Sequence, residues 1–204
     1  MNKTAVLTLI RHGETPANTG GVWHGSTDTP LSDRGHEQAR RVGKHLVDSP
    51  LSYHHIYSSP LQRARYTAEA IAAELGLEIN QDPGLTEFDL GSWEGKTYLE
   101  LHQEYRLWDH MKEDPDFAPH GGESPKQVVD RYVDALRRIA YAHPGQQVIV
   151  VGHGGALSMA LAELVEGTYT SWGRVMDNCA LSELRFEPEP TLERFNFTDH
   201  LKGV

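Results

Sequence analysis

The chain has little cysteine and no long apolar run, and both features limit the cellular compartments in which we expect it to function. A single cysteine among 204 residues, Cys179, cannot form an intramolecular disulfide, which fits a reducing compartment. The apolar run at residues 5–10 is too short for a signal-peptide core or a membrane span. We therefore predict a cytoplasmic protein without a membrane partner.

Basic residues are also scarce. The 19 Lys and Arg against 29 Asp and Glu give a formal charge of −10, and the chain contains no basic tract. This charge disfavours nucleic acid and anionic membranes as partners. It would also repel an anionic small molecule, so any phosphate site must gather several cationic side chains in one place. Arg11 is a first candidate.

Motifs for bound metals and nucleotides are missing as well. His36 and Glu37 are not followed by the second histidine of an H-E-x-x-H zinc helix, and no Cys/His cluster has zinc spacing. No G-x-G-x-x-G follows the apolar run at 147–151, and no P-loop pattern occurs in the chain. The sequence therefore predicts neither a metal nor a cofactor.

Strand-like and helix-like segments alternate along the chain, without a repeat or a linker. Short apolar runs predict strands, and apolar residues spaced by three and four after a capping residue predict helices. The expected strands are 5–10, 56–58, 77–79, 147–151 and an edge pair at 180–186 and 192–197; the expected helices begin at the caps Ser32, Ser59 and Ser124 or cover 98–111 and 156–164; a long loop spans 16–30. This pattern predicts one α/β domain over residues 1–204, a three-layer α/β/α sandwich with a mostly parallel central sheet.

Two of the expected strands end in the same kind of sequence. Arg11 and His12 follow the first strand, and His153 follows the strand at 147–151, in each case with glycine next. In an open α/β sheet the residues just past the carboxyl ends of the strands line the ligand crevice. The backbone N–H groups of Gly154 and Gly155, at the start of the following helix, could bind phosphate oxygens.

A further cation and a set of acids are weaker candidates when taken alone. Arg63 lies in the first turn of the helix that Ser59 opens, where a cation opposes the helix macrodipole unless an anion is nearby. A surface ion pair explains that position equally well. Glu87, Asp89 and Glu94 lie in an irregular stretch with aromatic residues, and spacing does not choose which of them could act as a general acid.

Taken together, these stretches resemble the motifs of the histidine phosphatase superfamily, the phosphoglycerate mutase-like enzymes. The resemblance runs from about residue 7 to residue 155 and includes Asn18, Gly25 and Gln38. Its main motifs are Leu9-Ile10-Arg11-His12-Gly13-Glu14-Thr15, Ser58-Ser59-Pro60-Leu61-Gln62-Arg63-Ala64, the stretch from Glu87 to Gly95, Gly121-Gly122-Glu123-Ser124 and Gly152-His153-Gly154-Gly155.

The resemblance implies a role for each matching residue and a phosphoglycerate mutase-like fold. His12 is implied as the phosphorylated nucleophile and Glu87 as the proton donor. Arg11, Arg63 and His153 are implied to hold the phosphoryl group, with Asn18 as a further contact. By analogy with the family, Trp23, His24, Gly25 and residues 101–122 are expected around the substrate. No metal is needed, because two arginines can neutralise the phosphoryl oxygens.

The stretch around the acid bears on the choice between phosphatase and mutase. Phosphoglycerate mutases typically show Glu-Arg-x-Tyr-Gly there, whereas this chain has Glu87-Phe88-Asp89-Leu90-Gly91. This version resembles the phosphatase branch, which includes α-ribazole phosphatases and broad-specificity phosphatases. We therefore predict a metal-independent phosphomonoester hydrolase acting on a small phosphorylated metabolite through a phosphohistidine on His12. A phosphoglycerate mutase is the alternative, an inactive phosphate-binding module is less favoured, and a homodimer is left open.

Overall fold

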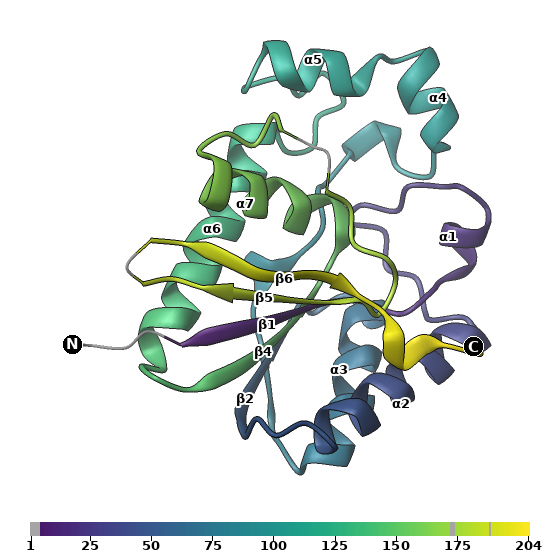
Figure 1. The fold of residues 1–204 in the computed structure, drawn as a ribbon. Coiled ribbons are helices and arrows are strands. Elements are labelled where there is room, and N and C mark those ends of the chain that lie inside the picture. Colours follow the sequence, from purple (N-terminus) through teal and green to yellow (C-terminus); the bar gives the residue numbers. More distant parts are fainter. Residues whose placement is uncertain (1–4, 172–173, 188) are drawn as a thin grey trace.

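A six-stranded sheet forms the centre of the computed structural model, which describes residues 5–171, 174–187 and 189–204 (Figure 1). The strand order is β3-β2-β4-β1-β5-β6. The bounds are β1 Val6–Arg11, β2 Tyr53–Ser58, β3 Ile79–Gln81, β4 Gln147–Gly152, β5 Leu181–Arg185 and β6 Thr191–Phe197. The first four strands pair in parallel, and β5 and β6 add an antiparallel edge. The prediction of a mostly parallel sheet is therefore confirmed.

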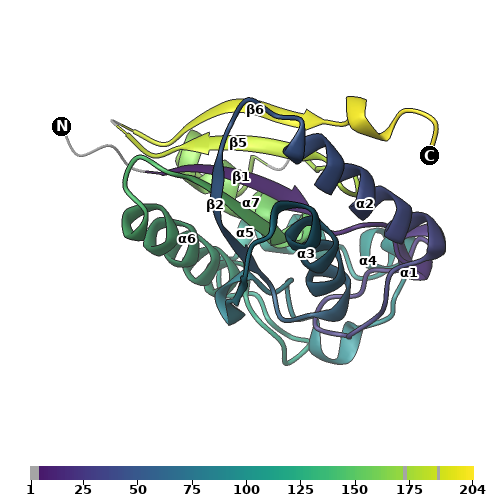
Figure 2. The same ribbon diagram turned by 90° about the horizontal axis from the view of Figure 1, so that it is seen from below.

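Helices cover both faces of this sheet, which gives three layers (Figure 2). On one face α2 Asp33–Val47 packs against α3 Gln62–Leu75, and on the other α6 Pro125–Ala142 packs against α7 Gly154–Glu166. Successive residues of a strand point to opposite faces. Leu9 therefore joins the core under α6 and α7, whereas its neighbour Ile10 joins the core under α2 and α3.

The helix ends follow from local chemistry in the sequence. Ser32 caps α2 by accepting a hydrogen bond from the Gly35 N–H, and Ser124 forms a capping box with Gln127 at the start of α6. Gly76 ends α3 in the left-handed conformation, with φ of 67°, which glycine adopts without steric cost. These three boundaries agree with the sequence prediction.

The segment 98–111 was expected as one helix, and this prediction is wrong. Two short helices occupy it, α4 Tyr98–Gln103 and α5 Leu107–Glu113. Arg106 lies between them with φ of 45°, in the left-handed region, where a right-handed helix cannot continue. Figure 1 shows α4 and α5 together at one end of the molecule, beyond α7.

Three smaller boundaries also differ from expectation. The helix after Ser59 begins later, at Gln62, because Leu61 rather than Ser59 is the N-cap. The loop at 16–30 contains one short helix, α1 Pro16–Thr19. The strand expected at 77–79 lies at Ile79–Gln81. None of the helices within the described residues is long and apolar enough to cross a membrane.

Candidate active site

His12 follows β1 directly and is 4% exposed. Its Nδ1 lies 2.7 Å from the backbone oxygen of Gly13. A carbonyl can only accept, so Nδ1 carries the proton and Nε2 keeps a free lone pair. Burial, together with the charges of Arg63 and Arg11, holds the pKa of His12 well below its ordinary value. The ring is therefore neutral near pH 7, as a nucleophile must be.

The turn after His12 depends on glycine. A Cβ added to Gly13 would lie 2.6 Å from the backbone oxygen of Gly35 in α2. The Gly13 N–H donates to Thr67 Oγ1 in α3 at 3.0 Å. Contacts to α2 and α3 therefore fix the position of Gly13, whose carbonyl oxygen accepts the hydrogen bond from His12 Nδ1.

Arg63 lies in the first turn of α3, as expected, and is 2% exposed. Its NH1 donates to the backbone oxygen of Thr27, and its NH2 donates to those of His24 and Gly25, at 2.8–3.0 Å. Three of the five guanidinium N–H groups thus hold the preceding loop. The surface ion pair that the sequence left open does not occur, because this side chain is buried and lines a cavity.

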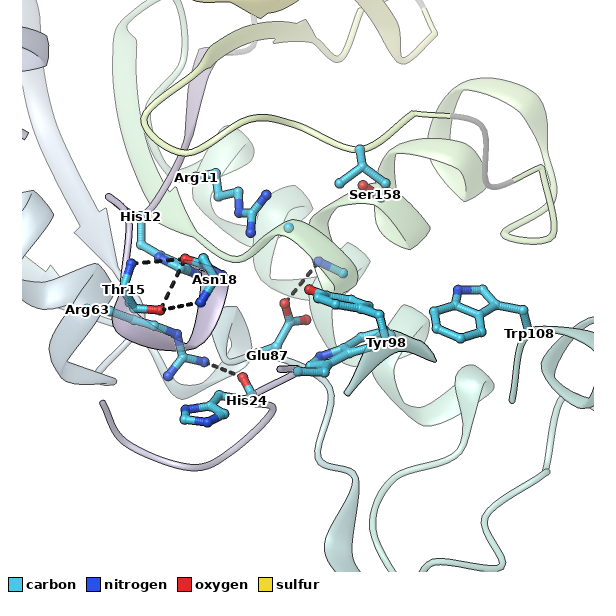
Figure 3. A pocket seen from close by; sticks show the side chains of 14 residues that line it. Arg11, His12, Thr15, Asn18, His24, Arg63, Glu87, Tyr98, Trp108 and Ser158 are labelled. Carbon is cyan, nitrogen blue, oxygen red and sulfur yellow. Dashed lines mark hydrogen bonds between the residues drawn. The ribbon is translucent and has the colours of Figure 1, made fainter. Parts of the chain in front are cut away.

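Arg11, the last residue of β1, reaches the same cavity from another side (Figure 3). Its NH1 donates to the backbone oxygen of Met176 at 2.7 Å. A Cβ on Gly154 would lie 3.0 Å from Arg11 Nε, so glycine at this position leaves room for the guanidinium. Within the described part of the chain, the buried Nε of Arg11 has no hydrogen-bond partner.

His153 follows β4 and is fully buried beside His12, with the two ring centroids 5.2 Å apart. Its Nε2 lies 2.8 Å from Ser59 Oγ. Ser59 Oγ also accepts from the Leu61 N–H at 3.3 Å, ahead of the first turn of α3, where Leu61 is the N-cap. Burial is the largest cause of a lowered His153 pKa, and Arg63, His12 and Arg11 lower it further. His153 is not among the described residues that line the cavity.

Glu87 occupies the centre of the site in Figure 3 and is 6% exposed. Its Oε1 accepts from the backbone N–H groups of Phe88 and Ala156, and its Oε2 accepts from that of Gly155, at 2.6–3.0 Å. The Gly155 N–H was expected to bind phosphate. That expectation is corrected, because the start of α7 binds the Glu87 carboxyl instead.

The sequence could not choose among three acids, and the structure separates them. Glu87 lines the cavity. Glu94 accepts from the backbone N–H groups of Gly25, Ser26 and Thr27, and Asp89 accepts from Ser26 Oγ. Glu94 and Asp89 therefore hold the loop that also binds Arg63. Gly25 belongs to that loop and is not among the described lining residues, although a substrate contact was expected of it.

Asn18 lines the cavity and its side-chain oxygen is already used. That oxygen accepts from the Thr15 N–H, from Thr15 Oγ1 and from Asn178 Nδ2. The amide NH2 of Asn18 is then left as the donor for a ligand. Asn178 also donates to the backbone oxygen of His12 at 3.0 Å. Asn178 was not predicted from the sequence, because it lies 160 residues from Asn18 and matches no motif.

These residues surround a cavity of about 230 Å³ (Figure 3). Its described lining includes seven of the nine site residues expected from the sequence, namely Arg11, His12, Asn18, His24, Arg63, Glu87 and Gly154. Trp23, Tyr98, Trp108 and Val175 line it as well. No group of three His, Cys, Asp or Glu side chains in the described ranges is arranged to hold a metal ion. The cavity thus combines a neutral histidine, two guanidinium groups and one carboxyl.

Comparisons with known proteins agree with this geometry. Residues 7–198 match the model of the histidine phosphatase superfamily, branch 1. The metal-independent phosphoserine phosphatase of Arabidopsis thaliana is 38% identical over 206 residues, which cover 97% of this chain and 84% of that protein. The adenosylcobalamin/alpha-ribazole phosphatase of Escherichia coli is 33% identical over 163 residues, 78% of each protein.

Solved structures give the same result. The phosphoserine phosphatase of Entamoeba histolytica, in complex with 3-phosphoglyceric acid, matches with a TM-score of 0.85 and 30% identity, over 97% of this chain and 99% of that one. The fold and family expected from the sequence are confirmed. The chain therefore belongs to the histidine phosphatase superfamily, branch 1, and is a phosphatase.

Proposed function

We propose that the chain is a cytoplasmic, single-domain phosphomonoesterase that works without metal through a phosphohistidine on His12. The observation that carries this proposal is the hydrogen bond from His12 Nδ1 to the Gly13 carbonyl, which leaves Nε2 as a nucleophile in a cavity shared with Arg11 and Arg63. The substrate is a small phosphorylated metabolite. Relatives named phosphoserine and α-ribazole phosphatases support hydrolysis, whereas others are named probable phosphoglycerate mutases, which keeps transfer as the alternative.

The proposed first step transfers the phosphoryl group to His12. Its Nε2 attacks phosphorus in line, the N–P bond forms, and the bond from phosphorus to the leaving oxygen breaks. Arg11 and Arg63 balance the charge on the phosphoryl oxygens, and the Asn18 amide donates to one of them. Glu87 gives its proton to the leaving oxygen, which departs as an alcohol.

The second step returns the enzyme to its starting state. Water attacks the phosphohistidine, and Glu87, now a carboxylate, takes the proton of that water. The N–P bond breaks, inorganic phosphate is released, and His12 is neutral again. Each turnover consumes one water and leaves Glu87 protonated, so the atoms and protons balance.

Trapping the intermediate tests this proposal. Rapid quenching at neutral to alkaline pH should yield an acid-labile phosphoryl group on the peptide that contains His12. The variant His12→Ala should form none and lose turnover, whereas His36→Ala, which removes an exposed histidine of α2, should behave like the parent protein. Full turnover by His12→Ala would refute the proposal, and absence of any phosphorylated peptide during turnover would do the same.

The mutase alternative has a separate test. A mutase returns the phosphoryl group to a bound sugar acid, whereas a phosphatase admits water. With 3-phosphoglycerate we expect at most slow release of phosphate and little 2-phosphoglycerate. Rapid interconversion of the two phosphoglycerates without release of phosphate would make the chain a mutase.

A further inference from the structure

The half of the cavity away from the arginines is built from aromatic rings. Trp23, Tyr98 and Trp108 line it, with ring centroids of Trp23 at 5.6 Å from Tyr98 and 5.9 Å from Trp108. Figure 3 shows Tyr98 and Trp108 on one side of Glu87, and His12, Asn18 and Arg63 on the other. A substrate with its phosphorus at His12 and its leaving oxygen at Glu87 therefore places its leaving group among these rings.

The aromatic wall continues outside the cavity. Tyr98 and Trp108 also line a more open groove of about 630 Å³, together with Leu99, His102, Asp109 and Lys112. Six large apolar side chains are exposed in the described part of the chain, and three of them, Tyr98, Leu99 and Val175, line the cavity or this groove. Leu99 is 61% exposed and Val175 is 59% exposed. The groove thus presents exposed apolar side chains directly beside the cavity, where a leaving group longer than the cavity would contact them.

The charges in the cavity argue against an acidic leaving group. Arg11 and Arg63 are the only Lys or Arg residues among its described lining, and the proposed function assigns both to the phosphoryl group. Burial lowers the pKa of the one further histidine, His24, and so favours its neutral form. A second carboxylate would thus meet Glu87 and aromatic rings without a cationic partner, which is costly. In the groove, Lys112 and Asp109 have opposite charges, so together they add no net positive charge that would favour an acidic leaving group.

We propose that the natural substrate is the phosphate ester of an uncharged alcohol with an apolar or aromatic body, which packs against Tyr98 and Trp108 and extends over Leu99. This inference rests on the proposed function and narrows its substrate class. It predicts discrimination against phosphoserine and phosphoglycerates, whose leaving groups carry a carboxylate. Tyr98 and Trp108 act as specificity residues, because they contact the leaving group and not the phosphorus.

The test compares esters that share a primary alcohol as leaving group, so that chemistry at phosphorus varies little. The substrates are ethyl phosphate, 2-phenylethyl phosphate, L-phosphoserine and 3-phosphoglycerate. Burial of one phenyl group by the enzyme should raise kcat/KM for 2-phenylethyl phosphate over ethyl phosphate by about ten- to a hundredfold. The two carboxylate esters should fall below ethyl phosphate.

Variants of single residues test which side chains produce the preference for the phenyl-bearing substrates. Trp108→Ala should remove most of the preference for 2-phenylethyl phosphate, so that the ratio of its kcat/KM to that of ethyl phosphate falls toward one. Leu99→Asp alters an exposed side chain, so folding is not at risk, and should lower kcat/KM for the longer 4-phenylbutyl phosphate several-fold. Leu51→Asp, which makes the same change at an exposed leucine that lines neither the cavity nor the groove, is the matched control and should leave the ratios unchanged.

Three results would overturn the inference. They are equal kcat/KM for ethyl and 2-phenylethyl phosphate, a preference for either carboxylate ester, and an equal loss on all substrates in Trp108→Ala with an unchanged melting temperature. Each leaves the phosphatase proposal standing if His12 is still phosphorylated. If no ester phosphorylates His12, the proposed function fails and the inference fails with it.

Discussion

The contacts of the Glu87 carboxyl predict which of its oxygens carries the proton. Oε1 accepts two N–H groups, from Phe88 and Ala156, whereas Oε2 accepts one, from Gly155. Each carboxyl oxygen has two lone pairs, so Oε1 is saturated and Oε2 keeps one lone pair for a proton. We therefore expect the leaving alcohol to receive its proton from Oε2.

The same contacts set the structural cost of Glu87→Gln. The amide oxygen can replace Oε1 and keep two hydrogen bonds, but the NH2 group then faces the Gly155 N–H, donor to donor. In the opposite orientation the NH2 group would take the place of Oε1 and face two N–H donors, those of Phe88 and Ala156, which destabilises the variant more. One buried donor without an acceptor costs about 1–3 kcal/mol. For a chain of this size, each kcal/mol lowers Tm by about 2–4 °C. We expect a folded variant with Tm lower by about 2–12 °C.

The catalytic cost depends on the leaving group. General acid catalysis is typically worth about 10²–10⁴-fold, and it matters most when the departing oxygen is strongly basic. Glu87→Gln should therefore slow phosphorylation of His12 by primary alkyl phosphates within that range. Aryl phosphates, whose phenolate departs without a proton, should show a clearly smaller loss.

The assay is single-turnover formation of phosphohistidine with one alkyl and one aryl phosphate. Steady-state rates do not serve, because Glu87 also activates the water of the second step. Asp89→Asn and Glu94→Gln are the controls, since both carboxylates bind the loop at residues 25–27. Equal losses for alkyl and aryl substrates in Glu87→Gln would refute the acid role. A loss that depends on the leaving group in either control would assign that role elsewhere.

Three further predictions follow from the same geometry. Exhaustive chelation should leave activity unchanged, and restoration of lost activity by zinc or magnesium would contradict the role of the two arginines. Asn178→Ala loses the hydrogen bonds to Asn18 and to the His12 carbonyl. In this variant KM and the Ki of vanadate should rise about tenfold, with a smaller change in kcat. The distant control Asn80→Ala should leave KM and the Ki of vanadate unchanged. His12 and His153 have pKa values below the ordinary 6.5 and bind fewer protons in the folded state. Their contribution to the free energy of unfolding is fully present above pH 6.5. As the pH drops below 6.5 the unfolded state takes up protons first, and this contribution decreases by up to about 1.4 kcal/mol per pH unit for each histidine. Denaturant midpoints that do not fall between pH 6.5 and 5.5 would contradict this.

Local sequence was sufficient for the parts of the site that follow strands. The apolar runs that became β1 and β4 pair in parallel, so the residues after their carboxyl ends, His12 and His153, had to lie close together. Ser32 and Ser124 capped their helices because capping depends on a few neighbouring residues.

Contacts between distant segments could not be predicted. Asn178 reaches Asn18 only because β5 returns antiparallel beside β1. Ser59 has the composition of an N-cap, yet its hydroxyl bonds His153, a contact that depends on the tertiary fold. The break at Arg106 interrupts a run of aromatics that continues the helical pattern, and neither glycine nor proline marks it.

The position of β1 in the sheet has a consequence for synthesis of the protein. β1 is the first strand to be made, yet its neighbours are β4 and β5, so 135 residues separate Arg11 from Gln147, the first residue of its nearest partner. At about 5–20 residues per second, translation takes about 7–27 s to cover that distance. During this time Val6-Leu7-Thr8-Leu9-Ile10, an uncharged segment with high strand propensity, has no strand to pair with. The nascent chain thus exposes an aggregation-prone segment until most of the protein has been translated.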